Sequence, residues 1–184
     1  MSAANPNDLS FRVATHADVE AIVALVHSAY RGESSRAGWT TEADLLDGTR
    51  TDADEVARLI DGAASAILLA EWNAQIIASA ALECRQDTGY FGMFGVQPGL
   101  QSNGVGSAVL SEAERYAQTV WSCRQMEMTV ITLRPELIAW YERRGYCRTG
   151  VFKPFPQDNP RYGLPRRPGL RLEVLRKTLA SDPR

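Results

Sequence analysis

The segment Gln101-Ser-Asn-Gly-Val-Gly106 has the residue types of a phosphate-binding turn, and it stands between a strand-like run and a helical pattern. Backbone amides at the start of a helix lack partners within the helix, and the helix dipole adds partial positive charge there. Gly104 and Gly106 let the backbone approach a ligand closely, so the turn could bind phosphate without a lysine. The alternative is an exposed turn in which Asn103 caps the next helix.

A second segment, Leu133–Tyr146, has the start and end signals of a compact helix. Pro135 suits the first helical position, and Gly145 suits the position that ends the helix. Arg143 and Arg144 would lie near the negative end of the helix dipole, where cations are favoured.

Together the two segments resemble the GNAT superfamily of acyl-CoA-dependent N-acetyltransferases. Its members pair Q/R-x-x-G-x-G/A after the fourth strand with a later helix that ends in Tyr-x-x-x-Gly-Tyr/Phe. The matching residues here are Gln101, Gly104 and Gly106 for the first motif, and Tyr141, Gly145 and Tyr146 for the second. The resemblance covers roughly residues 11–151. Arg134 and Ala78 depart from the pattern, since many relatives carry Asn and Gly there.

The resemblance implies an α/β (α+β) fold with a mixed, mostly antiparallel central sheet of about six to seven strands and helices on both faces. It also implies acetyl-CoA as co-substrate and no metal, with the coenzyme in a wedge between the fourth and fifth strands. The pantetheine arm would pair with main-chain groups of Phe94, Gly95 and Val96. The other coenzyme contacts implied are Gln101, Ser102, Asn103, Gly104, Val105, Gly106, Ser107 and Arg134.

Tyr141 matches the tyrosine that many GNAT enzymes place beside the coenzyme sulfur. A phenol there could protonate the leaving thiolate, and its ordinary pKa of about 10 keeps it protonated at neutral pH. The alternative is packing of Tyr141 against Leu137, which lies on the same helical face.

The general base is less clearly indicated. Some family members use a Glu on the fourth strand, but residues 90–96 contain no carboxylate. Glu83, on the preceding strand, is the nearest candidate, and Glu33 and Glu42 are others. Each could equally be a solvated surface carboxylate, and a water chain or capture of the neutral amine could replace the base.

The resemblance places the acceptor amine between residues 30–50 and 152–169. We expect its contacts to include Tyr30, Glu33, Trp39, Glu42 and Phe155. Aromatic walls with a few charged groups suit a small polar ligand. Carboxylates in these segments favour a polyamine or aminoglycoside, whereas the arginines favour an acceptor with a carboxylate or phosphate, so the sequence leaves the acceptor open.

The elements that must position these residues follow from periodicity and turn signals. We expect a flexible N-terminus over residues 1–10 and one N-acetyltransferase domain over 11–180. The predicted strands cover 11–15, 66–72, 75–83, 90–96, 126–133, 146–151 and 170–175, and the predicted helices cover 16–29, 51–62, 105–120 and 134–144. A capping pattern at 41–44 predicts a short helical turn, and five prolines predict a long irregular loop over 152–169.

Composition narrows the class of protein. A net charge of −2 gives no support to a nucleic-acid or anionic-membrane partner. Three scattered cysteines fit neither a disulfide framework nor a structural zinc site. The first residues lack the pattern of a signal peptide, and no apolar run is long enough to span a bilayer, so we expect a cytoplasmic protein.

The function expected from the residues and the resemblance is transfer of an acetyl group from acetyl-CoA to a primary amine of a small molecule, by direct attack in a ternary complex. Two alternatives are a non-catalytic acyl-CoA sensor, favoured by the missing fourth-strand carboxylate, and an enzyme that acetylates proteins or peptides. A nucleotide-binding protein is disfavoured, because the turn lacks the Lys-Ser/Thr of a P-loop. A homodimer is left open.

Overall fold

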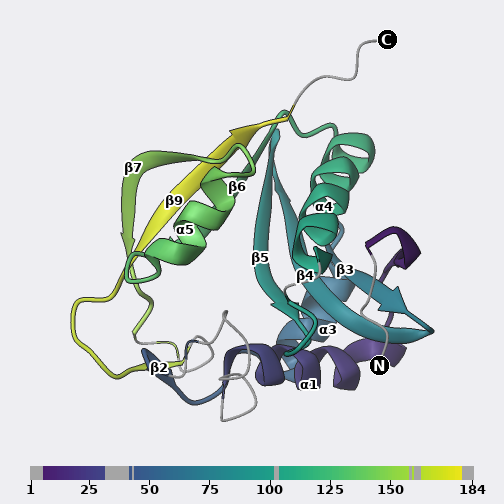
Figure 1. Ribbon diagram of the computed structural model, residues 1–184, viewed down its shortest axis with the longest axis horizontal. Helices are drawn as coiled ribbons and strands as arrows, with labels where there is room; N and C mark the ends of the chain where they lie inside the picture. The colour runs from purple at the N-terminus through teal and green to yellow at the C-terminus, as the bar shows by residue number, and fades with distance from the viewer. Residues whose placement is uncertain are drawn as a thin grey trace.

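The computed structural model describes residues 6–31, 42, 44–101, 104–157, 159 and 163–179. Its main feature is a seven-stranded sheet with helices packed against both faces (Figure 1). The strands are β1 (Ser10–Val13), β3 (Ser65–Trp72), β4 (Gln75–Arg85), β5 (Thr88–Val96), β6 (Gln125–Ile131), β7 (Cys147–Pro154) and β9 (Arg171–Thr178). The helices are α1 (Val19–Tyr30), α3 (Ala53–Asp61), α4 (Val105–Trp121) and α5 (Pro135–Glu142), with short 3-10 turns at Pro6–Asp8 and His16–Asp18.

The strand order is β1-β3-β4-β5-β6-β9-β7, and all neighbours are antiparallel except β5 and β6. These two are parallel because α4 carries the chain from the end of β5 back to the start of β6, as a parallel pair requires. The mixed, mostly antiparallel sheet with helices on both faces confirms the predicted fold class.

Two core layers follow from the alternation of side chains along the strands. Ile67 and Leu69 of β3 pack with α1 and α3 on one face. Leu68 and Ala70 of the same strand belong to the layer that includes α4 and α5 on the other face. Because consecutive strand residues point to opposite faces, one apolar run supplies both layers, which is why β3 is apolar without alternation.

Local signals account for several helix ends. The capping box predicted at Thr15 is present, with its amide donating to Asp18 Oδ2 at 2.8 Å. The N-cap of α3 is Asp52, one residue later than the capping pattern that begins at Thr51 indicates, because the side chain of Asp52 accepts from the Glu55 amide at 2.8 Å. Gly145, three residues after the end of α5 at Glu142, has φ +88°, so glycine suits the turn that follows the helix.

The region predicted as one long loop, residues 152–169, contains two strand segments. β7 continues through Pro154, beyond the predicted end at Val151. A two-stranded sheet pairs β2 (Leu46–Asp47) with β8 (Leu164–Pro165). The pairing is only two residues long on each side, too short for periodicity to show it.

Three further observations concern the described residues. The sulfurs of Cys84 and Cys123 lie 3.8 Å apart, although the sequence separates them by 39 residues. No helix in this part of the chain is long and apolar enough to cross a bilayer. No group of three metal-ligating side chains gathers within it.

Candidate active site between strands β5 and β6

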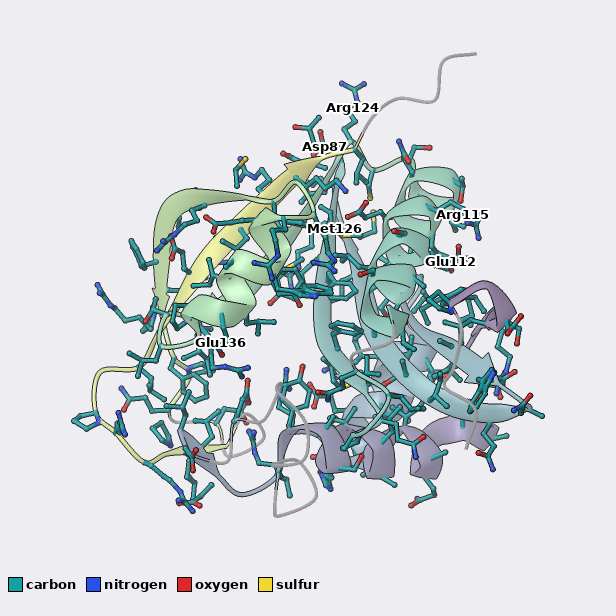
Figure 2. All side chains as sticks on the ribbon, viewed as in Figure 1. Asp87, Glu112, Arg115, Arg124, Met126 and Glu136 are labelled. Carbon is teal, nitrogen blue, oxygen red and sulfur yellow. The ribbon has the colours of Figure 1, made fainter. Side chains whose placement is uncertain are left out.

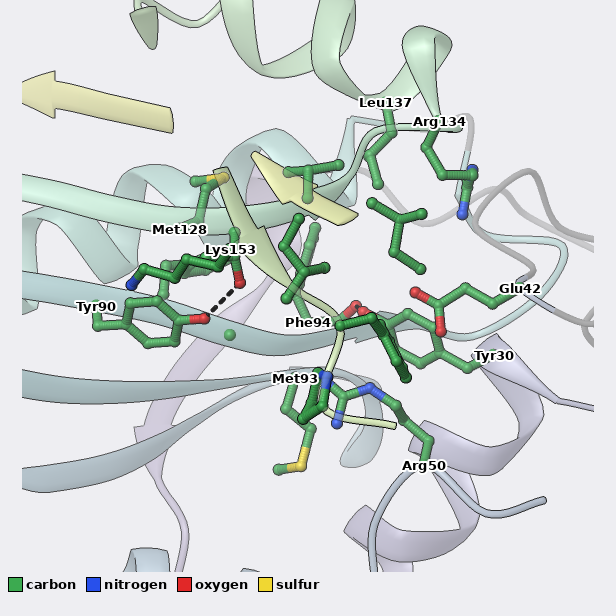
Figure 3. Close-up of a pocket in the computed structure, with 18 of the residues that line it drawn as sticks. Tyr30, Glu42, Arg50, Tyr90, Met93, Phe94, Met128, Arg134, Leu137 and Lys153 are labelled. Atoms are coloured by element: carbon green, nitrogen blue, oxygen red, sulfur yellow. Dashed lines mark hydrogen bonds between the residues drawn. The ribbon is translucent and has the colours of Figure 1, made fainter. Parts of the chain in front are cut away.

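A cavity of about 340 Å³ opens where β5 and β6 separate. The two strands pair only over Thr88–Tyr90, although β5 continues to Val96 and β6 to Ile131. Beyond Tyr90 the edge of β5 that faces β6 therefore has no partner strand among the described residues. Figure 3 shows the side chains that converge on this cavity.

A β-bulge in β5 accompanies the separation. Ser79 pairs with Gly95 and Ala81 with Gly92, so β5 has one more residue than β4 in this stretch. Met93 lies in the bulge with φ +44°, a left-handed conformation that L side chains rarely adopt. Such bulges bend a strand and often occur next to active sites, and here the bend lies on the wall of the cavity.

Side chains from outside the sheet satisfy two carbonyls of this stretch. The Tyr30 hydroxyl, at the end of α1, donates to the carbonyl of Phe94. Gln101 Nε2 donates to the carbonyl of Val96 at 3.1 Å. The predicted pantetheine-binding residues thus lie at the open edge of β5, and Gln101 uses its side chain to hold the end of that strand. Phe94 also lines the cavity (Figure 3).

The glycine turn leads into α4 as the sequence predicts. Gly104 has φ +79° and occupies the N-cap position without a capping side chain. Gly106 is buried, and a Cβ there would lie 3.4 Å from the rings of Phe94 and Trp140, which is van der Waals contact distance. The amides of the first turn of α4 are therefore available to an anion. Ser102 and Asn103 lie outside the described residues.

Arg144 is a cation beside this turn, although its position in the sequence indicates only a helix end. Its Nη2 donates to the Ser107 hydroxyl at 2.6 Å, and its guanidinium stacks 3.6 Å above the Trp140 ring. Trp140 lies in α5 and Arg144 lies two residues beyond its end at Glu142; their separation of four residues was the available signal. The contact with Ser107 joins residues 37 apart in sequence, so only the folded chain shows it.

Tyr141 lies in the cavity wall, buried against the rings of Trp140 and Tyr146. Its hydroxyl forms no hydrogen bond with a described residue. Burial raises the pKa of Tyr141 well above its ordinary value, so the phenol stays protonated. Tyr146, the last tyrosine of the motif, has a different environment: its buried hydroxyl donates to Glu114 at 3.0 Å.

Glu42 brings a carboxylate into the same cavity. Arg31 holds it, with Nη1 to Oε2 at 2.8 Å, and the Glu42 amide donates to the Tyr30 carbonyl at 3.2 Å. Burial raises the pKa of the neighbouring Tyr30 to about 12. Figure 3 shows Glu42 beside Tyr30 at one end of the cavity.

Glu83, by contrast, is not among the described residues that line the cavity. Its side chain is 40% exposed and pairs with Arg85 at 3.1 Å. In register it faces Tyr90 across β4 and β5. The sequence made Glu83 the nearest candidate for the base, but among the described residues it is Glu42 that lines the cavity.

The remaining predicted residues divide into three groups. Phe155 is buried and lines the cavity, together with the neighbouring Lys153 of β7. Arg134, the N-cap of α5, is buried in the wall and pairs with Glu136 at 2.5 Å; Figure 2 shows Glu136 at the start of that helix. Glu33 and Trp39 lie outside the described residues.

Comparisons with known proteins agree with this arrangement. A sequence profile described as the acetyltransferase (GNAT) family matches residues 26–146. No curated protein sequence matches the chain significantly.

Several solved structures share the fold. A protein assigned as a phosphinothricin N-acetyltransferase is 20% identical, with a TM-score of 0.68 over 94% of this chain and 99% of that one. The spermidine/spermine N-acetyltransferase SpeG from Vibrio cholerae is 16% identical, with a TM-score of 0.67 over 96% and 95%. A ribosomal-protein alanine N-acetyltransferase from Escherichia coli is 13% identical, with a TM-score of 0.65 over 95% and 96%.

The profile covers well over half of the chain, from within α1 to the end of the Tyr-x-x-x-Gly-Tyr motif. It includes the bulged strand, the glycine turn and the helix that carries Tyr141. The chain therefore belongs to the acetyltransferase (GNAT) family and is an acetyl-CoA-dependent N-acetyltransferase.

Proposed function

We propose that this protein acetylates a primary amine of a small molecule by direct attack of the amine on acetyl-CoA, with both substrates bound together. The observation that carries the proposal is that one cavity contains both a buried phenol, Tyr141, and a carboxylate, Glu42. Direct transfer is assisted by a base that takes the proton of the ammonium and an acid that gives a proton to the departing thiolate. Similar folds include enzymes named for spermidine and for phosphinothricin, both small amines.

Three parts of the chain fit the coenzyme. The open edge of β5 beyond Tyr90 offers backbone groups to the amides of the pantetheine arm. The first turn of α4 offers unpaired amides and the positive end of a 17-residue helix to the pyrophosphate. Arg144, held between Trp140 and Ser107, adds a positive charge beside the same turn. Bound acetyl-CoA supplies the activated acetyl thioester.

Tyr141 is suited to give a proton to the departing thiolate. Its raised pKa keeps the proton on the phenol before the reaction, and no described residue competes for the hydroxyl. Tyr30, on the other wall, has its hydroxyl engaged by the Phe94 carbonyl, so it positions the bulged strand.

Glu42 is suited to take the proton from the acceptor ammonium, directly or through one water. The hydrogen bond from Arg31 fixes one carboxylate oxygen and leaves the other for the substrate. We therefore propose Glu42 as the base in place of Glu83, whose side chain pairs with Arg85.

The coenzyme site is tested by adding a negative charge at the helix start. Ser107→Asp is expected to fold, because an acidic residue in the first turn of a helix is favourable and Arg144 lies within reach. It should weaken acetyl-CoA binding about tenfold or more through repulsion of the pyrophosphate. Ser111→Asp, one turn further along the exposed side of α4, is the matched control.

Calorimetric titration with acetyl-CoA measures the effect. Weaker binding in Ser107→Asp, with wild-type affinity in Ser111→Asp, would support the site. Equal affinity in all three proteins would place the pyrophosphate elsewhere, and no binding to the wild type would remove the proposed function.

A further inference from the structure

The cavity that holds Tyr141 is predominantly cationic. The charged side chains in its described lining are Arg50, Arg85, Arg134, Lys153 and Glu42. The one carboxylate among them already accepts from Arg31 at 2.8 Å, and two of the cations, Arg85 and Arg134, pair with carboxylates outside the described lining, Glu83 and Glu136. A second positively charged group would be repelled by such a lining, whereas an oxyanion would be attracted.

The charges are arranged at two ends. In Figure 3, Lys153 and Tyr90 lie at one end of the cavity, and Glu42 and Arg134 lie at the other. Glu42 is a suitable partner for an ammonium group and lies at the end opposite Lys153. The cavity therefore presents its one described carboxylate at the end that also holds Arg134 and Arg50, and Lys153 at the other end, where the described lining has no carboxylate.

The end near Tyr90 has the groups of an oxyanion site. The guanidinium of Arg85 stacks 3.7 Å above the Tyr90 ring and pairs with Glu83 at 3.1 Å, and these two contacts hold it in place. The Tyr90 hydroxyl and Thr129 Oγ1 share a hydrogen bond of 2.8 Å. Lys153 forms no ion pair with a described residue, so its ammonium is available to a ligand.

We infer that the acceptor is a small amine that also carries a carboxylate or similar oxyanion, and that a polyamine is a poor substrate. The amine lies toward Glu42, and the oxyanion lies toward Lys153 and Arg85. This inference rests on the proposed acetyl transfer and adds the class of acceptor. Charge-assisted hydrogen bonds to a carboxylate supply the preference, and repulsion by the same cations disfavours a second ammonium.

The test uses acceptors that differ only at the end away from the amine. Matched sets are 5-aminopentanoate, pentylamine and cadaverine, and 4-aminobutyrate, butylamine and putrescine, with spermidine as the longer polycation. Release of free CoA gives kcat/KM for each. We expect the aminocarboxylate to exceed the alkylamine by about 10- to 100-fold, as one charged hydrogen bond provides, and the diamine to be the poorest of each set.

Lys153→Met should reduce the preference for the aminocarboxylate over the alkylamine by about tenfold. Arg124→Met removes the same charge where the side chain points outward at the far end of the molecule (Figure 2), and should leave the preference unchanged. A melting curve checks folding, with Lys153→Gln as the second variant. Calorimetric binding of N-acetyl-5-aminopentanoate gives a readout without turnover, and it should weaken in the Lys153 variants only.

Diamines or spermidine used as well as the aminocarboxylates would overturn the inference and leave the acetyltransferase function in place. An equal preference in the wild type and in Lys153→Met would also overturn it. If acetyl-CoA binds but no amine in the panel is acetylated, the acceptor class is wrong. Failure of acetyl-CoA to bind would instead remove the proposed function itself.

Discussion

Removing the Tyr141 hydroxyl tests the proposed acid with little disturbance of the fold. The Tyr141→Phe ring keeps its contacts with Trp140, at a centroid distance of 4.9 Å, and with Tyr146, at 5.8 Å. The lost hydroxyl has no hydrogen-bond partner among the described residues, so the free energy of unfolding should change by less than about 0.5 kcal/mol. Turnover should fall about 100- to 10,000-fold, the usual contribution of a positioned acid.

Tyr146→Phe is the matched control, because it removes the same atom from a neighbouring ring outside the cavity lining. Its hydroxyl donates to Glu114, which also accepts from Lys177 at 2.6 Å. Loss of one buried hydrogen bond to a charged group should cost about 1.5–3 kcal/mol of unfolding free energy and lower Tm by several degrees. Turnover should stay within about twofold of the wild type, since this hydroxyl does not reach the reacting atoms.

The assays are single-turnover acetyl transfer, calorimetric binding of acetyl-CoA and thermal unfolding. The two variants should differ: Tyr141→Phe should lose turnover and keep its stability, whereas Tyr146→Phe should lose stability and keep its turnover. Because burial raises the pKa of Tyr141, the wild-type rate should show no decline near pH 10 from loss of this proton. Full turnover in Tyr141→Phe would refute the acid assignment, and Glu42 would then need another partner in the cavity.

Two further predictions concern carboxylates. Glu42→Gln should lower turnover at neutral pH about 100-fold or more, and the loss should shrink at high pH, where the acceptor amine is already neutral. Turnover of the control Glu83→Gln should stay within about twofold of the wild type. A pH–rate profile in which Glu83→Gln shows the larger loss would assign the base to β4. The Arg12 guanidinium holds the pKa of the Asp18 carboxyl well below its usual range. The ionised Asp18 therefore contributes its full stabilisation of the fold above the unfolded-state pKa of about 3.9, and this contribution is lost as pH falls through the lower folded-state pKa. Asp18→Asn should therefore lower the free energy of unfolding by about 1.5–3 kcal/mol at pH 7, and the difference from the wild type should shrink at acid pH. Urea unfolding at both pH values measures this difference, and an equal difference at acid pH would count against this ion pair.

Local physics in the sequence accounts for most of the fold. Alternating apolar and polar residues, helical spacing and capping residues predicted the strands of the main sheet and the helices packed against it, because these signals act over a few neighbouring residues. The glycine turn was predictable for the same reason, since Gly104 takes a left-handed conformation that glycine adopts without strain. The segment after Val151 was predicted less well, because β2 and β8 form only by pairing with each other.

The composition of the site depended on tertiary structure. Met93 adopts φ +44° in the bulge, and no property of methionine indicates this, because the surrounding pairing imposes it. The sequence favoured Glu83 over Glu42 as the base, and only the position of each relative to the separating strands shows that Glu42 lines the cavity.

The sequence by itself therefore determined the family, the order of the elements in the main sheet and the glycine turn before α4, each of which is encoded by residues close together in the chain. Only the tertiary structure decided which charges face the cavity. Arg85 and Lys153 come from strands that are distant in sequence, and both line the cavity near Tyr90, where the pairing of β5 with β6 stops. The charge of a cavity is a sum over all the elements around it, so it exists only once those elements have packed.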